Sequence, residues 1–210
     1  MRSLLLAITL LHFSISIANA AGNLGDQFVT AKLAYDASID VPRSWQVMRD
    51  NEMRAIETAA GAAIDLSGYA RLVDGTESLL VASFPDRLLY ASVTVTSTAL
   101  RGSTRSSAAT LSEAQLRSGD LTIRQGMEAT LARLGGKAWG WTPLKTITLG
   151  RTTVLHISYL RSSDAGGRRV HIYKCFGTGR IYDVALSTSV VAEDVNGVVL
   201  KRIAESFSAP

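Results

Sequence analysis

Reactive side chains are scarce in this sequence. The 210 residues include a single cysteine, Cys175, and three histidines. One cysteine cannot form a disulfide within the chain, so packing alone must stabilise the fold. Cys175 lies in an alternating run of apolar and polar residues, which favours a small, half-buried residue over a nucleophile. A zinc site needs about three or four converging ligands, and His156, His171 and one cysteine do not supply them. We therefore expect neither a metal nor a cofactor.

Signatures of catalysis are also missing. No serine lies in a Gly-x-Ser-x-Gly elbow, and residues 177–180 lack the spacing and the Lys-Ser/Thr ending of a phosphate-binding loop. The adjacent Glu193 and Asp194 lie near an expected helix start, where they suit the helix dipole rather than acid–base chemistry. We expect no enzymatic activity. The remaining alternative is an enzyme whose residues converge only in the folded chain.

Positive and negative charges nearly balance, with 22 basic and 18 acidic residues. Charged residues make up 19% of the chain, and the formal net charge is +4. Nucleic-acid binding would require a basic stripe or a recognisable reading helix, and the sequence has neither. We therefore exclude nucleic acid as a partner.

The first twenty residues resemble a secretory signal peptide. Arg2 precedes a mostly apolar run over residues 4–17, and Ala18-Asn19-Ala20 matches a cleavage site. The alternative is an uncleaved membrane anchor, but the apolar run is interrupted by polar residues and is shorter than the roughly 20 residues of a spanning helix. We expect a periplasmic or secreted protein without a stable membrane anchor after cleavage.

The chain beyond the signal peptide suits one domain of moderate size. Residues 21–32 begin with small and polar residues, which predicts a flexible lead-in. Residues 33–210 contain no internal repeat and no long linker. We therefore expect a single domain over that range.

Apolar periodicity predicts a strand over residues 34–41 that ends at Pro42, and a helix over residues 50–64. Two strands over residues 79–84 and 88–98 surround the Pro85-Asp86 turn. After a loop over residues 101–109, a capping box at residues 110–113 opens one long helix. Gly119 and Gly126 interrupt this helix, and Gly135-Gly136 ends it.

The last third of the chain is rich in strands. Glycine-containing turns separate predicted strands over residues 146–149, 153–160, 170–176 and 181–186, which indicates antiparallel hairpins. Apolar residues at 195, 199, 203 and 207 predict a final amphipathic helix. The fold class is therefore α+β, with one antiparallel sheet of about five to seven strands flanked by helices.

Four short segments carry a family likeness. They are residues 40–45, the Gly150-Arg151 turn with its following strand, residues 182–187 and residues 203–207. Together they resemble the PsbP-like superfamily, which includes photosystem II accessory protein P and DcrB-like exported bacterial proteins. The likeness spans residues 33–207. It implies an α/β/α sandwich that binds other proteins, and some exported members resemble immunity proteins.

Two groups of residues are candidates for partner binding. Arg161, Arg168, Arg169 and Arg180 lie on or beside two hairpin turns, which we place at one end of the sheet. Clustered guanidinium groups would suit carboxylates of an acidic partner, whereas the alternative is ordinary solvated turns. Trp139 and Trp141 surround Gly140 in a predicted loop. If exposed they would anchor a partner, but burial in the core is the favoured interpretation.

These observations lead to one functional hypothesis and one alternative. The hypothesis is an exported, non-enzymatic protein-binding module, either an accessory protein or an immunity-type protein, whose partner is a secreted toxin or an envelope protein. The alternative is a carrier that holds a small apolar molecule or lipid in a cavity between the sheet and the long helix.

Overall fold

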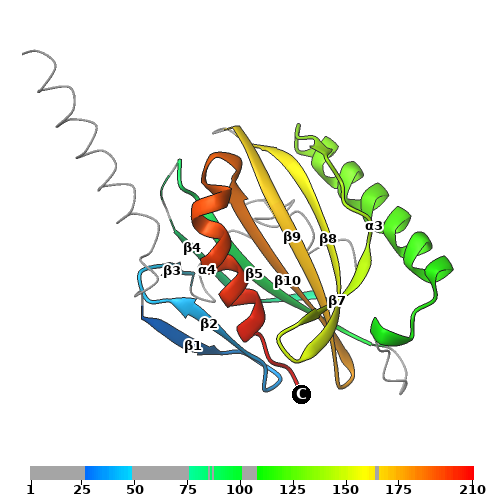
Figure 1. Ribbon diagram of the computed structural model, residues 1–210, viewed down its shortest axis with the longest axis horizontal. Coiled ribbons are helices and arrows are strands. Elements are labelled where there is room, and N and C mark those ends of the chain that lie inside the picture. The colour runs from blue at the N-terminus through cyan, green and yellow to red at the C-terminus, as the bar shows by residue number, and fades with distance from the viewer. Residues whose placement is uncertain (1–26, 49–75, 85, 87, 101–107, 164–165) are drawn as a thin grey trace, which may run out of the picture.

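An antiparallel sheet forms the centre of the computed structural model, which describes residues 27–48, 76–84, 86, 88–100, 108–163 and 166–210 (Figure 1). Its eight strands follow the order β3, β4, β5, β10, β9, β8, β6, and β7 also pairs with β8. The bounds are β3 Gln46–Val47, β4 Thr76–Phe84, β5 Ala91–Ala99, β6 Ala138–Trp139, β7 Lys145–Leu149, β8 Thr152–Ser163, β9 Gly166–Gly177 and β10 Arg180–Ser189. A separate hairpin pairs β1 Phe28–Lys32 with β2 Ser38–Pro42.

Tight turns join the long strands β7 to β10. Gly150 and Gly179 have φ angles of 59° and 69°, in the left-handed region that glycine adopts without strain. These turns fix the pairing register of their own hairpins, so that Lys145 lies opposite His156 and Tyr182 opposite Cys175. In the pairing of β8 with β9, His156 lies opposite Tyr173 and Arg161 opposite Arg168. The predicted strands of this region are confirmed; β7 is one residue longer than the apolar pattern indicated, and β8, β9 and β10 are four or five residues longer.

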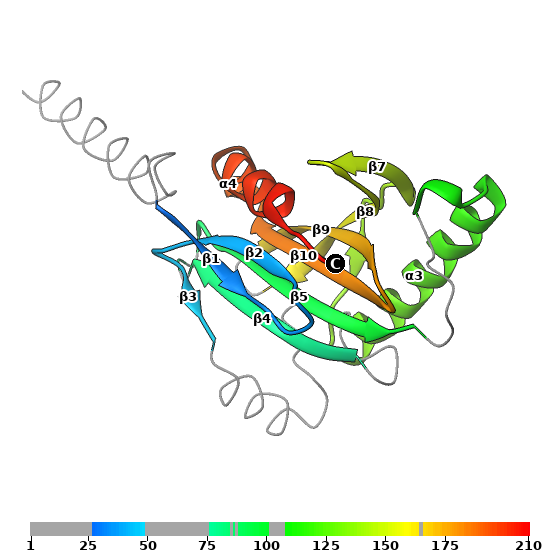
Figure 2. The same cartoon turned by 90° about the horizontal axis from the view of Figure 1, so that it is seen from below.

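Helix α4 (Glu193–Ser206) and the β1–β2 hairpin cover one face of the sheet (Figure 2). Alternate residues of β10, Tyr182, Val184 and Leu186, are buried here against Leu200 and Ile203 of α4. Because successive side chains of a strand point to opposite faces, the intervening residues of β10 point to the opposite side of the sheet. We call the side that α4 covers the α4 face.

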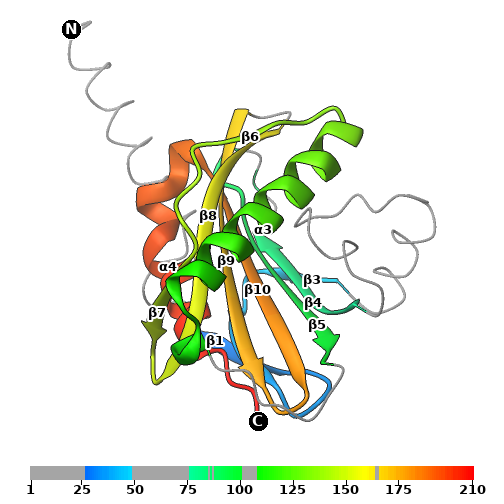
Figure 3. The same ribbon diagram turned by 90° about the vertical axis from the view of Figure 1, so that its right-hand side faces the viewer.

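Helix α3 (Glu113–Arg133) crosses the opposite face over β8 and β9 (Figure 3). Met127 is 0% exposed and packs in one cluster with Ile157, Tyr159 and Ile172. The Tyr159 hydroxyl donates to the Met127 sulfur at 3.4 Å, which satisfies a buried polar group without water. The predicted α+β class with a mostly antiparallel sheet is therefore confirmed.

Two details of the predicted helices differ from the structure. The capping box is formed by Ser112 and Gln115, because the Ser112 side chain accepts from the Gln115 amide and the Gln115 side chain accepts from the Ser112 amide. Thr110 instead belongs to the short helix η1 (Ala108–Thr110). Helix α3 then continues through Gly119 and Gly126, since packing against the sheet outweighs their low helix propensity.

The segment predicted as a lead-in, residues 21–32, ends in a strand. Phe28–Lys32 form β1, whose backbone pairs with β2 over its whole length. The predicted signal peptide, the helix over residues 50–64 and residues 101–107 of the predicted loop lie outside the described residues. Among the helices that the structure describes, none is long and apolar enough to cross a membrane.

Truncating the α3 core should destabilise the fold. Met127→Ala removes a fully buried side chain, and we expect the free energy of unfolding to fall by about 2–5 kcal/mol. Leu121→Ala, on the same helix but 56% exposed, should cost less than about 0.5 kcal/mol. Urea denaturation of both variants checks this difference, and equal losses would contradict the packing of α3 described above.

Candidate functional site

The four candidate arginines do not gather at one end of the sheet. Arg168 and Arg169 lie beside the β8–β9 hairpin, whereas Arg180 pairs with Gly177 beside the β9–β10 hairpin. From Arg169 to Gly177 the strand covers about 26 Å, at ~3.3 Å per residue. The expectation of one arginine cluster is therefore wrong, because successive hairpin turns of an antiparallel sheet lie at opposite ends.

Arg180 links the β1–β2 hairpin to the main sheet. Its guanidinium carbon lies 3.6 Å from the centroid of the Tyr35 ring, and its Nε donates to Ser97 Oγ at 2.6 Å. Its Nη2 also forms an ion pair with Glu77 at 3.2 Å. Tyr35 and Asp36 both have positive φ angles, so this cluster holds a strained turn in place. These contacts give Arg180 a structural role.

Arg161 and Arg168 are cross-strand neighbours on the side of the sheet that α3 covers. Arg161 is 8% exposed, so its guanidinium faces the interior rather than solvent. The guanidinium carbon of Arg168 lies 3.8 Å from the centroid of the Tyr90 ring, a cation–π contact. Of this pair, Arg168 is the side chain that stays partly exposed.

Arg169 lies on the α4 face. Its Nε is 3.4 Å from Glu193 Oε1, at the start of α4, and its Nη1 donates to the Gly140 carbonyl at 3.4 Å. The side chain therefore connects the first turn of α4 with the segment between the two tryptophans.

Trp139 and Trp141 have different environments. Trp141 is half-buried and stacks on Tyr159, with 4.4 Å between ring centroids. Trp139, in β6, is 44% exposed. Gly140 has a positive φ angle and breaks the alternation between them. The expected burial is therefore correct for Trp141 and wrong for Trp139.

Exposed apolar side chains surround the start of α4. A Cβ atom on Gly167 would lie 3.3 Å from Val190 and 3.8 Å from Trp139, so these two side chains lie close together above that glycine. Val191 is 78% exposed and Leu88 66%. Asn196 Nδ2 donates to the Leu89 carbonyl at 3.0 Å and holds the β4–β5 connection beside the helix.

We call this surface the hairpin-end patch. It comprises Leu88, Trp139, Arg169, Val190, Val191, Glu193 and Val195. Its valines were not predicted from the sequence, because the four-residue spacing places Val195 in the expected buried stripe of the last helix, whereas Val195 is 38% exposed. The consecutive residues Val190 and Val191 could have indicated an exposed valine, because two neighbouring side chains cannot both face the same core.

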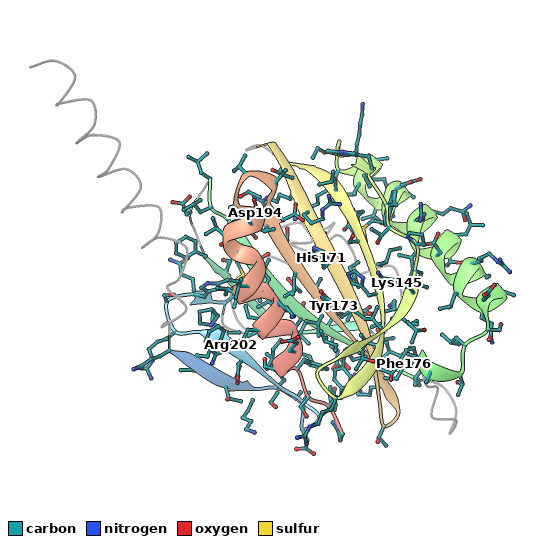
Figure 4. The ribbon with its side chains drawn as sticks, viewed as in Figure 1. Lys145, His171, Tyr173, Phe176, Asp194 and Arg202 are labelled. Carbon is teal, nitrogen blue, oxygen red and sulfur yellow. The ribbon has the colours of Figure 1, made fainter. Side chains whose placement is uncertain are left out.

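A second group of polar side chains lies on the α4 face between β7 and α4. Lys145, His156 and Tyr173 are direct cross-strand neighbours on β7, β8 and β9, and His171 lies two residues from Tyr173. His156 Nε2 and His171 Nδ1 are 3.1 Å apart. Figure 4 shows His171 and Tyr173 between α4 and Lys145, which lies on β7. We call these four residues the histidine strip.

The histidines of the strip are held in the neutral form. Burial lowers the pKa of His156 to about 4, helped by the charges of His171 and Lys145. Burial also lowers the pKa of His171, partly offset by Glu193. The Cys175 thiol lies on the same face, and burial raises its pKa to about 12, so it is not a reactive thiolate at neutral pH.

Sequence inspection treated His156 and His171 as scattered. They are separated by fifteen positions in the chain, and only the register of the β8–β9 hairpin brings them together. Within the part of the chain that the structure describes, no group of three or more His, Cys, Asp or Glu residues is arranged to hold a metal ion.

Comparison with known proteins identifies a fold but no family. No family model matches the chain, and no curated protein is detectably similar to it. Among solved structures, cyanobacterial PsbP (CyanoP) from Synechocystis has a TM-score of 0.56 at 12% identity, covering 90% of this chain and 96% of that one. The expected PsbP-like fold resemblance is therefore confirmed.

Two further structures are more distant. LpqN, described as involved in cell envelope biogenesis of Mycobacterium tuberculosis, has a TM-score of 0.40 at 13% identity, covering 91% of this chain and 96% of that one. A protein of Bacteroides thetaiotaomicron has a TM-score of 0.43 at 7% identity, covering 83% and 45%. At these scores the similarity supports no functional argument.

The histidine strip should make stability depend on pH. The folded pKa of His156 lies below its ordinary value of 6.5, so the unfolded chain binds more protons as the pH falls. We expect the contribution of His156 to stability to be present above about pH 6.5 and to be lost as the pH falls towards 4. His156→Gln should reduce the loss of melting temperature between pH 7.5 and 5.0. An unchanged pH dependence would contradict the burial of the pair.

Proposed function

We propose that the protein is an exported, non-enzymatic module that binds a protein partner through the hairpin-end patch. The single observation that carries this proposal is the grouping of Trp139, Val190 and Val191, all exposed, around the start of α4. Contiguous exposed apolar groups rimmed by polar ones are typical of interaction sites. The PsbP-like fold is compatible with this role but does not determine it.

The chemistry of the patch suits a protein rather than a small molecule. Trp139 offers a large, rigid apolar surface of the kind that dominates binding energy at interfaces. Valines with few rotatable bonds lose little conformational entropy when covered. The patch therefore combines an aromatic anchor with an apolar surround, as in the centre of a protein interface.

Charges at the rim favour an acidic partner surface. Arg169 is held in place by Glu193 and by the Gly140 carbonyl. A guanidinium group has more N–H donors than these two contacts use, so Arg169 can still bind a carboxylate. We propose a partner with an apolar contact surface and acidic residues at its edge. A toxin as the partner would make this an immunity-type protein. An envelope component as the partner would make it an accessory protein.

The alternative of a carrier with a cavity beneath the long helix has less support. In the described residues the space between α3 and the sheet is filled by Met127 and Tyr159, both 0% exposed. A Cβ atom on Gly119 would come within 3.2 Å of Leu144, so the start of the helix is also closely packed. We therefore favour the partner-binding surface over a cavity at that place.

Charging the centre of the patch should abolish partner binding. Val191→Glu places a carboxylate where an apolar contact is needed, and its high exposure means that the fold should tolerate it. Leu121→Glu, exposed on α3 away from the patch, is the matched control. We expect affinity capture from cell-envelope extract to recover a stoichiometric protein with wild type and the control but not with Val191→Glu. Equal recovery with all three would exclude the patch.

Reversing the rim charge should weaken the same interaction. Arg169→Glu removes a donor for the partner and adds a charge like that of Glu193. We expect association to slow about tenfold and to become less sensitive to salt, as for other rim charges. Lys201→Glu, on the exposed side of α4, is the control. Surface plasmon resonance at two salt concentrations measures both rates, and equal effects of the two variants would remove Arg169 from the interface.

A further inference from the structure

The outward side of helix α4 carries a symmetric charge pattern. Asp194, Val198 and Arg202 follow one another at intervals of four residues. Residues four apart in an α-helix lie on one face, so these side chains form a row along α4 with Val198 at its centre. Figure 4 shows Asp194 near the start of the helix and Arg202 beside its C-terminal half. We call these three residues the α4 row.

The α4 row is accessible to another molecule. Val198 is 55% exposed, and Asp194 and Arg202 are exposed as well. Beside Val198, a Cβ atom on Gly197 would have nothing within 4 Å, so another helix can approach the backbone closely at this point. An exposed valine between two exposed charges is thus available for contact.

The two charges of the row lack opposite charges. Within the described part of the chain, neither Asp194 nor Arg202 takes part in an ion pair, whereas Lys201 is paired with Glu205 at 3.7 Å. Asp194 and Arg202 lie about 12 Å apart along the helix axis, too far to pair with each other. The guanidinium carbon of Arg202 lies 3.9 Å from the centroid of the Phe28 ring, and this contact leaves its N–H donors available for a carboxylate.

A second copy of α4 would supply both missing charges. We propose that the protein forms a two-fold symmetric dimer in which two copies of α4 lie antiparallel and the axis passes between their Val198 side chains. Asp194 of each copy then pairs with Arg202 of the other, and the two valines cover each other at the centre. A parallel arrangement would instead bring like charges together. The α4 row shares no residue with the hairpin-end patch, so this inference does not depend on the proposed partner.

The size of the contact indicates a weak, reversible dimer. Helix α4 has 14 residues and is about 21 Å long. A contact limited to two such helices lies at or below the roughly 1,200 Å² at the lower end of stable interfaces, so we expect a dissociation constant on the order of 100 μM. Since both ion pairs are exposed, added salt should weaken the dimer.

Reversal of the two charges tests the pairing. In Asp194→Arg and in Arg202→Asp every charge pair of the dimer becomes a like-charge pair, so each variant alone should dimerise at least about tenfold more weakly than wild type. An equimolar mixture of the two should dimerise as strongly as wild type, because one copy then carries two arginines and the other two aspartates. Sedimentation equilibrium up to about 1 mM protein measures these affinities.

Three results of this experiment would overturn the proposal. They are a wild type that stays monomeric at about 1 mM, a single variant that dimerises as strongly as wild type, and a mixture no stronger than its components. Glu113→Arg, in the first turn of α3 and highly exposed, is the matched control for Asp194→Arg and should leave the dimer unchanged. If it weakens the dimer equally, net charge rather than the α4 row is responsible. Circular dichroism checks the folding of each variant.

A cysteine at the centre of the row tests the two-fold axis. Facing Cα atoms of two helices packed about 8–10 Å apart lie within the roughly 7 Å that a disulfide spans. We expect Val198→Cys to form a covalent dimer on oxidation with diamide. Leu121→Cys, 56% exposed on α3, should not, and the native Cys175 is buried. Equal cross-linking of the two variants, or none of Val198→Cys, would contradict the contact. Arg169→Glu should leave the dimer intact, so this proposal and the hairpin-end patch can fail separately.

Discussion

The register of β8, β9 and β10 is the constraint on which the rest of the structure depends. These three strands pair over nearly their full length, and each supplies alternate residues to the core beneath α3 and to the core beneath α4. A shift by one residue would exchange the two sets and expose both cores. The same register places His156 beside Tyr173, so the packing of the interior also determines which polar groups meet on the surface.

Local patterns were sufficient to predict most of the regular structure. Alternating apolar residues and glycine turns are properties of short segments, so the hairpins from Lys145 onwards could be identified directly. The short strands β1 and β6 could not, because three of the five residues of β1 are exposed, which leaves little apolar alternation, and β6 has only two residues. The position of the α3 capping box was missed for a different reason, since both Thr110 and Ser112 are suitable cap residues and tertiary packing selects between them.

The candidate site was less predictable because it depends on pairing. The separation of Arg169 from Arg180 could have been predicted, because successive hairpin turns lie at opposite ends of an antiparallel sheet. By contrast, the contact between His156 and His171 requires the observed register between β8 and β9, which apolar periodicity does not specify. The different exposures of Trp139 and Trp141 depend on the backbone at Gly140, and no residue pattern indicates that β6 ends there.

Arg169 and His171 are alternate residues of one strand and point to the same side of it, so the ion pair of Arg169 with Glu193 lies between the hairpin-end patch and the histidine strip. A strand fixed by pairing on both edges cannot move one of these side chains independently of the backbone that carries the other. The charge of Glu193 raises the pKa of His171 and that of Arg169 lowers it. Any change of this ion pair on binding at the patch therefore changes the protonation of His171, and protonation of His171 changes the affinity of the patch by the same free energy. Two surfaces that differ in chemistry would in that case behave as one thermodynamically linked unit.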